Sequence, residues 1–299
     1  MSVSLTSLND NLISQLALQA FVQTMAPLSR LSTSYSADAA RRGTVISVPI
    51  VANITATSAY GNYESVDTGS STAALVSITS YQKATIGVTD QQFHGSSFVD
   101  VEKFAFQQGK AVAKAVFQDV INGTVGATAG SNSFTSITVT SGASAVNLAL
   151  VRSGRATLVK NGAAIEDAAL VLNADSFSNL LSDSTNLLAN LAFGGDAIKE
   201  GKLPKVLGLE TFEVPAIPTT NNILGFIVHP SAVALAVRPL IPQDNSYYIE
   251  SRVVEDEQTG LAITYRRHYA PANGTHWVTM ESLYGYTAGI TGGAVVWHS

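Results

Sequence analysis

The sequence contains no cysteine among its 299 residues, which excludes disulfide bonds and thiolate metal ligands. It is also poor in charge, because only 13% of its residues are Asp, Glu, Lys or Arg, against roughly 25% in average globular proteins. The 17 basic and 22 acidic residues leave a net charge of −5, which argues against a surface built throughout to neutralise phosphates. Any contact with nucleic acid is therefore expected to be local and weak.

Targeting and membrane-spanning segments are not evident either. The first basic residue is Arg30, so the apolar start lacks the positive region of a signal peptide. The stretch from Leu12 to Met25 is interrupted by Gln and Ser, which a bilayer-spanning helix disfavours. We therefore expect no signal peptide and no membrane span.

Local motifs of catalysis and cofactor binding are missing. The sequence has no Gly-x-Ser-x-Gly elbow, no Gly-x-x-x-x-Gly-Lys loop and no Gly-x-Gly-x-x-Gly after a strand. The five histidines lack metal-ligand spacing, although His268 and His276 can face each other across a hairpin. His94 lies beside Ser96 and Ser97, which are expected to cap the following helix. We therefore predict no catalytic, cofactor-binding or metal site.

The first segment with a clear pattern is an N-terminal helix. Its apolar residues recur every three or four positions, which places them on one helix face. They are Leu5, Leu8, Leu12, Leu16 and Ala20. The pattern stops near Pro27, and a loose Ser- and Ala-rich segment follows from Ser29 to Gly43. Such a helix could dock on another subunit.

A long β-hairpin is predicted next. From Thr44 apolar residues alternate in a strand that runs toward Ala59, and the alternation returns from Val76 to Val88. The tip between the strands is rich in Gly and Ser and carries Glu64 and Asp67. The other face of the return strand is polar and includes Lys83. This polarity predicts an arm that projects from the body.

The strongest helical pattern spans Phe98 to Ile121. About 24 residues at 1.5 Å each predict a rod of roughly 36 Å. Lys103, Lys110 and Lys114 form a basic stripe on the side opposite the apolar face. Since the predicted hairpin tip is acidic, we hypothesise that the tip of one subunit docks near this helix of a neighbour.

The remaining chain predicts a mixed α/β or α+β region followed by an antiparallel meander. A short helix is expected to begin at Pro230 and to end at Pro239. The other expected elements are a strand at 136–140, a helix at 146–161, a strand at 168–172, helices within 175–191, strands at 211–214 and 223–228, meander strands at 247–254, 261–269 and 276–283, and a last strand at 294–297.

This order of elements resembles the major capsid (coat) proteins of tailed bacteriophages (Caudoviricetes), which have the Hong Kong 97 type of capsid fold. Local sequence is similar as well. The similar stretches are Pro27-Leu28-Ser29, Gly43 through Pro49, Gly225 through Pro239 as an A-domain helix, Thr259-Gly260-Leu261, Arg267-His268-Tyr269 and Leu283-Tyr284-Gly285.

The resemblance implies an α+β fold with five named parts. It implies hexamers and pentamers that form an icosahedral shell around double-stranded DNA, in a virion assembled in the bacterial cytoplasm. Portal, scaffolding or decoration proteins are further expected partners. Some relatives cross-link a Lys to an Asn, but beyond Lys83 nothing in this sequence marks that chemistry. The expected parts are an N-arm (1–43), an E-loop hairpin (44–95), a spine helix with the start of the P-domain (96–144), an A-domain (145–245) and C-terminal strands that complete the A- and P-domains (246–299).

Three alternatives stay open at this point. An encapsulin-like nanocompartment shell is similar in fold and encloses cargo proteins instead of a genome. A phage tail or adhesion protein would be rich in β structure, and the long predicted helix counts against it. A hydrolase without a local motif would have to draw on His94, His229 or His268.

Overall fold

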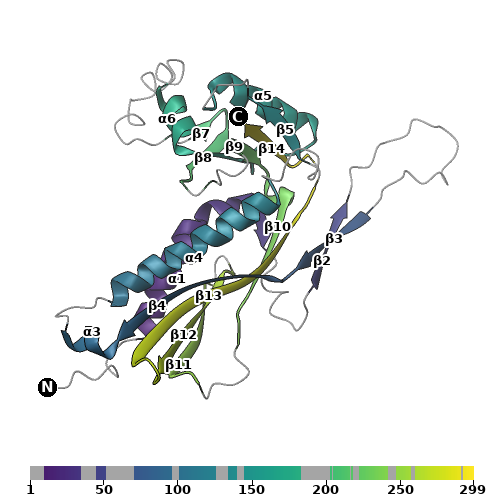
Figure 1. Cartoon of the computed structure of the whole chain (residues 1–299). Helices are drawn as coiled ribbons and strands as arrows, with labels where there is room; N and C mark the ends of the chain where they lie inside the picture. The colour runs from purple at the N-terminus through teal and green to yellow at the C-terminus, as the bar shows by residue number, and fades with distance from the viewer. Residues whose placement is uncertain are drawn as a thin grey trace, which may run out of the picture.

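A computed structural model gives the structure of the chain and shows two six-stranded sheets with two long helices between them (Figure 1). A two-stranded hairpin extends from the side of this body (Figure 1). The described residues are 10–34, 45–51, 71–95, 101–125, 134–139, 145–182, 203, 205–215, 217, 222–241, 247–256, 260–290 and 292–299.

The lower sheet is organised around one long strand, β13 (Thr275–Ala288). On one edge β13 pairs with β12 (Ala262–Ala270) and then with β10 (Val233–Arg238), and on its other edge it pairs with β4 (Ser80–Thr89). Two outer strands complete the sheet; they are β11 (Glu250–Glu255) beside β12 and β1 (Ser32–Ser34) beside β10. The predicted antiparallel meander is therefore confirmed as β11–β12–β13.

Two helices lie side by side on the lower sheet, α1 (Asp10–Leu31) and α4 (Val101–Gly123). The helices approach closely at Gly109, where an added Cβ would lie 2.2 Å from the carbonyl oxygen of Ala17. The prediction of a long helix is confirmed by α4. The face of α1 that packs against α4 and the sheets carries Ile13, Ala17 and Phe21 rather than the predicted Leu12 and Leu16, and Leu12 is 38% exposed. Docking of this helix on another subunit stays a prediction. Helix α1 also continues past Pro27, whose neighbour Leu28 is buried in the core.

The hairpin consists of β2 (Val45–Val51) and β3 (Ser71–Ser77). Its base is attached to β10 by a small apolar cluster that includes Val48, Val76 and Ala234. The predicted return strand is in fact broken between β3 and β4. Strand β4 belongs to the body, because β13 offers it a ladder of ten residue pairs and a lone ribbon is marginally stable. The prediction of a projecting arm is therefore wrong for residues 80–89.

The upper sheet has the strand order β5-β14-β9-β6-β8-β7. Its strands are β5 (Thr135–Thr138), β14 (Ala294–His298), β9 (Ile223–Val228), β6 (Ala169–Leu172), β8 (Leu209–Glu213) and β7 (Lys205–Val206). Helices α5 (Leu148–Lys160) and α6 (Ala174–Ser182) cover one face through a second apolar core. The other face joins the core of α1 and α4. The strands and helices expected in this region are confirmed where they are described.

The prediction for the segment that follows β9 is wrong. Residues 230–239, expected as a helix, form a 3-10 turn at Pro230–Ala232 and then strand β10. A short run of alternating Ala and branched apolar residues fits a buried strand as well as a helix. The place of β10 between β1 and β13 decides in favour of the strand. The resemblance of this segment to an A-domain helix fails for the same reason.

Across the described residues, no helix has the length and apolar character needed to cross a bilayer.

Candidate assembly surfaces

The basic stripe of α4 lies on the exposed side of the helix, as predicted. Lys103, Lys110 and Lys114 are all exposed, while the opposite side of α4 is buried against α1 and the lower sheet. A gap of seven and then four residues returns the chain to the same helix face. Glu64 and Asp67, the proposed partners of the stripe, lie outside the described residues, so the docking of tip and helix stays a prediction.

The hairpin presents an apolar face that nothing in the described chain covers. In its register Val45 pairs with Ser77 and Leu75 pairs with Ser47, so these four residues share one face. Leu75 is 59% exposed and Val45 is 48% exposed. The opposite face carries the residues that pack on β10. One face of the hairpin therefore attaches it to the body, and the other exposes the apolar side chains of Val45 and Leu75.

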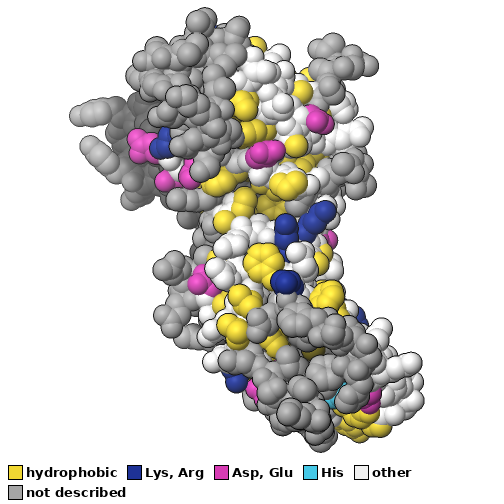
Figure 2. Space-filling view, turned by 90° about the vertical axis from the view of Figure 1, so that its left-hand side faces the viewer, with side chains coloured by type: hydrophobic (Ala, Val, Ile, Leu, Met, Phe, Trp, Pro, Cys, Tyr) yellow, Lys and Arg dark blue, Asp and Glu magenta, His cyan; other side chains and the backbone are white. Residues whose placement is uncertain are grey.

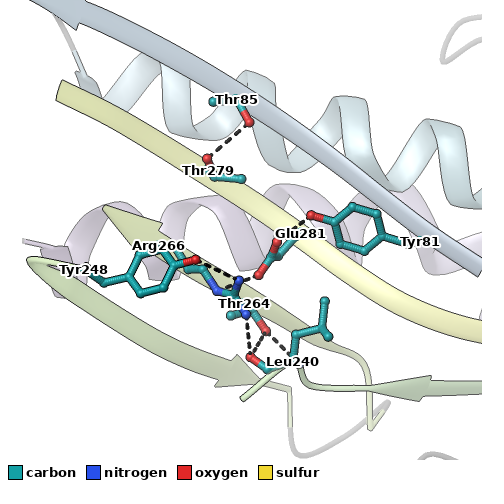
Figure 3. A network of polar contacts seen from close by, with 8 residues as sticks. All are labelled: Tyr81, Thr85, Leu240, Tyr248, Thr264, Arg266, Thr279 and Glu281. Carbon is teal, nitrogen blue, oxygen red and sulfur yellow. Dashed lines mark hydrogen bonds and ion pairs between the residues drawn. The ribbon is translucent and has the colours of Figure 1, made fainter. Parts of the chain in front are cut away.

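A buried ion pair lies under the outer face of the lower sheet (Figure 3). The Nε atom of Arg266 on β12 is 2.7 Å from Oε1 of Glu281 on β13, and only 3% of the Glu281 side chain is exposed. Tyr81 on β4 donates a hydrogen bond of 2.6 Å to Oε2 of the same carboxylate. The guanidinium carbon of Arg266 lies 5.2 Å from the centre of the Tyr248 ring. The network joins the neighbouring strands β4, β13 and β12 at one point.

Lys83 stands beside this network. It is exposed and lies directly across the β4–β13 ladder from Glu281. Burial, helped by the hydrogen bond to Glu281, raises the pKa of the Tyr81 hydroxyl well above its usual range. The neutral phenol therefore stays a donor to the carboxylate at physiological pH. The structure gives Lys83 the place of an exposed cation at the rim of a buried ion pair.

Two further tyrosine–carboxylate bonds fix the helices to the sheet. Tyr265 of β12 donates to Oδ1 of Asp10 at 2.6 Å, and Arg267 lies 3.0 Å from Oδ2 of that carboxylate. Tyr284 of β13 donates to Oδ2 of Asp119 at 2.5 Å. Both phenols are fully buried, and burial followed by the hydrogen bond raises the pKa of each. Helix α1 is thus held at its first turn and α4 near its last.

His268 and His276 do not form the pair that their positions in the meander suggest. His268 pairs with Trp277 and Tyr269 pairs with His276, so the two histidines point to opposite faces of the sheet, and the expectation that they face each other is wrong. His276 lies 3.6 Å from Asp90, and burial lowers its pKa against the opposing effect of that carboxylate. His229 caps the 3-10 turn by accepting from the Ser231 backbone N–H. No group of three metal-ligating side chains occurs in the described residues.

The expected cap of α4 cannot be compared with the structure, because Ser96 and Ser97 lie outside the described residues. Sequence reasoning found the basic stripe, the hairpin and Lys83, but it missed the apolar hairpin face and the tyrosine–carboxylate bonds. The alternation of residues 71–77 does indicate the apolar hairpin face, because Leu75 lies on the opposite face from Val76. The tyrosine–carboxylate bonds have no local signal in the sequence, since Tyr265 and Asp10, for example, are 255 positions apart.

Comparison with known proteins identifies the fold. No protein-family model matches the chain, and no curated protein does. A solved structure from Mycobacterium phage Che8 is similar over 88% of this chain and 87% of that chain, with 18% identity and a TM-score of 0.63. The capsid structure of the Cyanophage P-SCSP1u is similar over 89% and 86%, with 15% identity and a TM-score of 0.61.

A virus-like particle from Pyrococcus furiosus is also similar. The match covers 96% of this chain and 98% of that chain, with 11% identity and a TM-score of 0.59. At identities this low the TM-scores show likeness of the fold alone, and the coverage shows that this likeness extends over nearly the whole of each chain. The chain has the α+β fold of the Hong Kong 97 type that its sequence predicts.

Proposed function

We propose that this chain is the major capsid protein of a tailed bacteriophage. It assembles with copies of itself into hexamers and pentamers, and these form an icosahedral head that encloses double-stranded DNA. The observation that carries the proposal is the similarity to phage capsid structures over nearly the full length of both chains. The role is structural rather than catalytic, and the protein belongs to the virion after assembly in the bacterial cytoplasm.

The surface of the subunit supports this proposal. A shell subunit needs large contacts with several neighbours, and low charge limits the repulsion between closely packed copies. The chain has 13% charged residues and exposes large apolar side chains on the hairpin and on the outer side of the lower sheet. The latter include Tyr81, Ile249 and Val253. Contact of these apolar side chains with water is unfavourable, and burial between copies removes it.

We also propose an assignment of the five expected parts to the observed elements, although β4 and β10, which fall within the expected E-loop and A-domain bounds, lie in the lower sheet. We assign α1 to the N-arm (1–43), the β2–β3 hairpin to the E-loop (44–95) and α4 to the spine helix. We assign the upper sheet with α5 and α6 to the A-domain, and the lower sheet to the P-domain. Under this assignment the last strands serve both domains, because β13 lies in the lower sheet and β14 in the upper.

We propose that one contact between subunits is made by the tip of the hairpin. The acidic tip with Glu64 and Asp67 of one copy docks near Lys110 and Lys114 of a neighbour, with Lys103 on the same stripe. Reversal of both lysines to Glu is expected to impair assembly and to leave the thermal unfolding of the subunit unchanged. Normal assembly by that double variant would contradict the docking. Contact with packaged DNA is expected to be weak and without sequence preference.

The proposal is tested by electron microscopy of the protein produced alone in bacteria, with an absorbance ratio measured on the large-particle fraction. Closed shells tens of nanometres across are the expected result. Fibres or small fixed oligomers would contradict it. If the protein stays monomeric alone and with a co-expressed scaffolding protein, the proposal is also wrong.

A second function has one observation in its favour, the similarity to the Pyrococcus furiosus virus-like particle over 96% of this chain. A nanocompartment shell would enclose protein instead of a genome. Particles from cells that carry the complete phage genome would distinguish the two. An absorbance spectrum dominated by nucleic acid supports the capsid, and a protein spectrum with a co-purifying cargo chain supports the compartment.

A further inference from the structure

A two-residue turn at the edge of the upper sheet carries a leucine in an unfavourable backbone conformation. Strands β7 and β8 pair through Val206 and Leu209, so only Leu207 and Gly208 connect them. Their φ angles are +53° and +87°, as a type I′ turn requires. The first position of such a turn favours Asn, Asp or Gly, because a positive φ is unfavourable for a residue with a larger side chain such as leucine.

The strained leucine is only partly covered by its own subunit. Its side chain remains 38% exposed, so packing against its own subunit leaves much of it in water. Asn222, the other non-glycine residue with positive φ in the described part, is of the type that tolerates this conformation. A strained residue whose apolar side chain also stays partly exposed points to a role outside the subunit.

The surroundings of Leu207 indicate what kind of partner it meets. A Cβ on Gly208 would come within 4.0 Å of Ile165, so the turn lies beside the segment that follows α5. Exposed charges of both signs are close to the turn along the chain, since Lys205 is two residues before the leucine, and Glu166 and Asp167 directly follow Ile165. Figure 2 shows hydrophobic, acidic and basic side chains next to one another on the upper part of the molecule.

A mixed-sign rim around an apolar centre is typical of a protein interface and unsuitable for a polyanion such as DNA. Because both signs are present, Lys205 of one copy can meet the carboxylates of Glu166 and Asp167 of the next copy in a head-to-tail contact. We propose that Leu207 is an anchor between subunits, buried against the upper domain of a second copy of this chain. The inference rests on the proposed self-assembly and assigns one contact within it.

Substitution of the leucine separates folding from assembly. Leu207→Asn suits the turn better, so the thermal unfolding midpoint of the isolated subunit is expected to rise by about 2 °C. The critical concentration for shell assembly is expected to rise roughly fivefold, because the burial of part of a leucine is lost at each contact. Asn222→Leu is the matched control, which places leucine at the other strained position. It should lower the midpoint and leave the critical concentration unchanged.

Two results would overturn the inference. Assembly of Leu207→Asn at the wild-type critical concentration would show that the side chain makes no contact between copies. A lowered unfolding midpoint of this variant would show that the leucine is instead packed within its own subunit. Failure of the wild-type protein to form any particle is a different outcome, which would refute the proposed function itself.

Discussion

Buried tyrosines make the stability of this subunit sensitive to alkaline pH. Tyr265 and Tyr284 are fully buried and donate to Asp10 and Asp119, and their pKa values are raised by burial first and by these bonds second. Unfolding returns each phenol to an ordinary pKa of about 10. Below that pH both states hold the proton, so the stabilisation is fully present. Above it only the folded state does, and stability falls until the folded pKa is reached.

The size of the effect follows from proton counting. Between about pH 10 and the raised folded pKa, the unfolded state binds one proton fewer for each buried phenol. The free energy of unfolding therefore falls by about 1.4 kcal/mol per pH unit for each tyrosine. Tyr265 and Tyr284 together contribute a slope of about −2.7 kcal/mol per pH unit. Partial relaxation of the folded state reduces this figure and does not change its sign.

The assay is urea unfolding of the dissociated subunit, followed by tryptophan fluorescence at several pH values from about 8 to about 11. Lysines and the other tyrosines also titrate in this range, so the quantity to compare is the difference in slope between variants. Tyr265→Phe and Tyr284→Phe should each remove up to about 1.4 kcal/mol per pH unit from the slope above about pH 10 and leave the lower part of the range unchanged. Tyr247→Phe, at a site that is 81% exposed, should keep the wild-type slope. A double Phe variant with the wild-type slope would refute the reasoning.

Three further substitutions test the packing and the assembly surfaces. Gly109→Ala should lower the free energy of unfolding by about 1–3 kcal/mol, because the added Cβ would meet α1. Helix propensity alone predicts an increase of about 1 kcal/mol. The sign of the change in a urea titration therefore shows whether the close packing of the two helices outweighs helix propensity. Arg266→Met should cost about 3–5 kcal/mol in the same titration by leaving Glu281 buried without its partner, and most of that loss should return when Glu281→Gln is added. Leu75→Asp should reduce shell yield by size-exclusion chromatography without lowering the unfolding midpoint, and an unchanged yield would argue against a contact at the hairpin face.

The elements that the sequence predicts well are those with a long regular period. Helix α4 and the meander repeat their apolar positions over many residues, so the local pattern and the tertiary contacts favour the same structure. Strand β10 was mistaken for a helix because its alternating small and branched residues fit both periods, and its flanking strands β1 and β13 come from the two ends of the described chain. Local pattern contains no information about such partners.

In the candidate assembly surfaces, too, local features could be predicted from the sequence and contacts between distant residues could not. The stripe of Lys103, Lys110 and Lys114 could be read from helix geometry, and the structure places all three on the exposed side of α4. The buried bond from Tyr284 to Asp119 could not, since the two residues are 165 positions apart. Nor could the division of the return strand into β3 and β4, which depends on the ladder that β13 offers.

The two strands nearest the end of this chain are central to its two sheets. Strand β14 lies between β5 and β9, and β13 lies between β4 and its partners β12 and β10. During synthesis, neither sheet can close before residues 275–298 have been made, because each lacks an inner strand until then. Pairing over such long sequence separations is slow. A nascent chain that lacks these residues therefore has neither sheet complete.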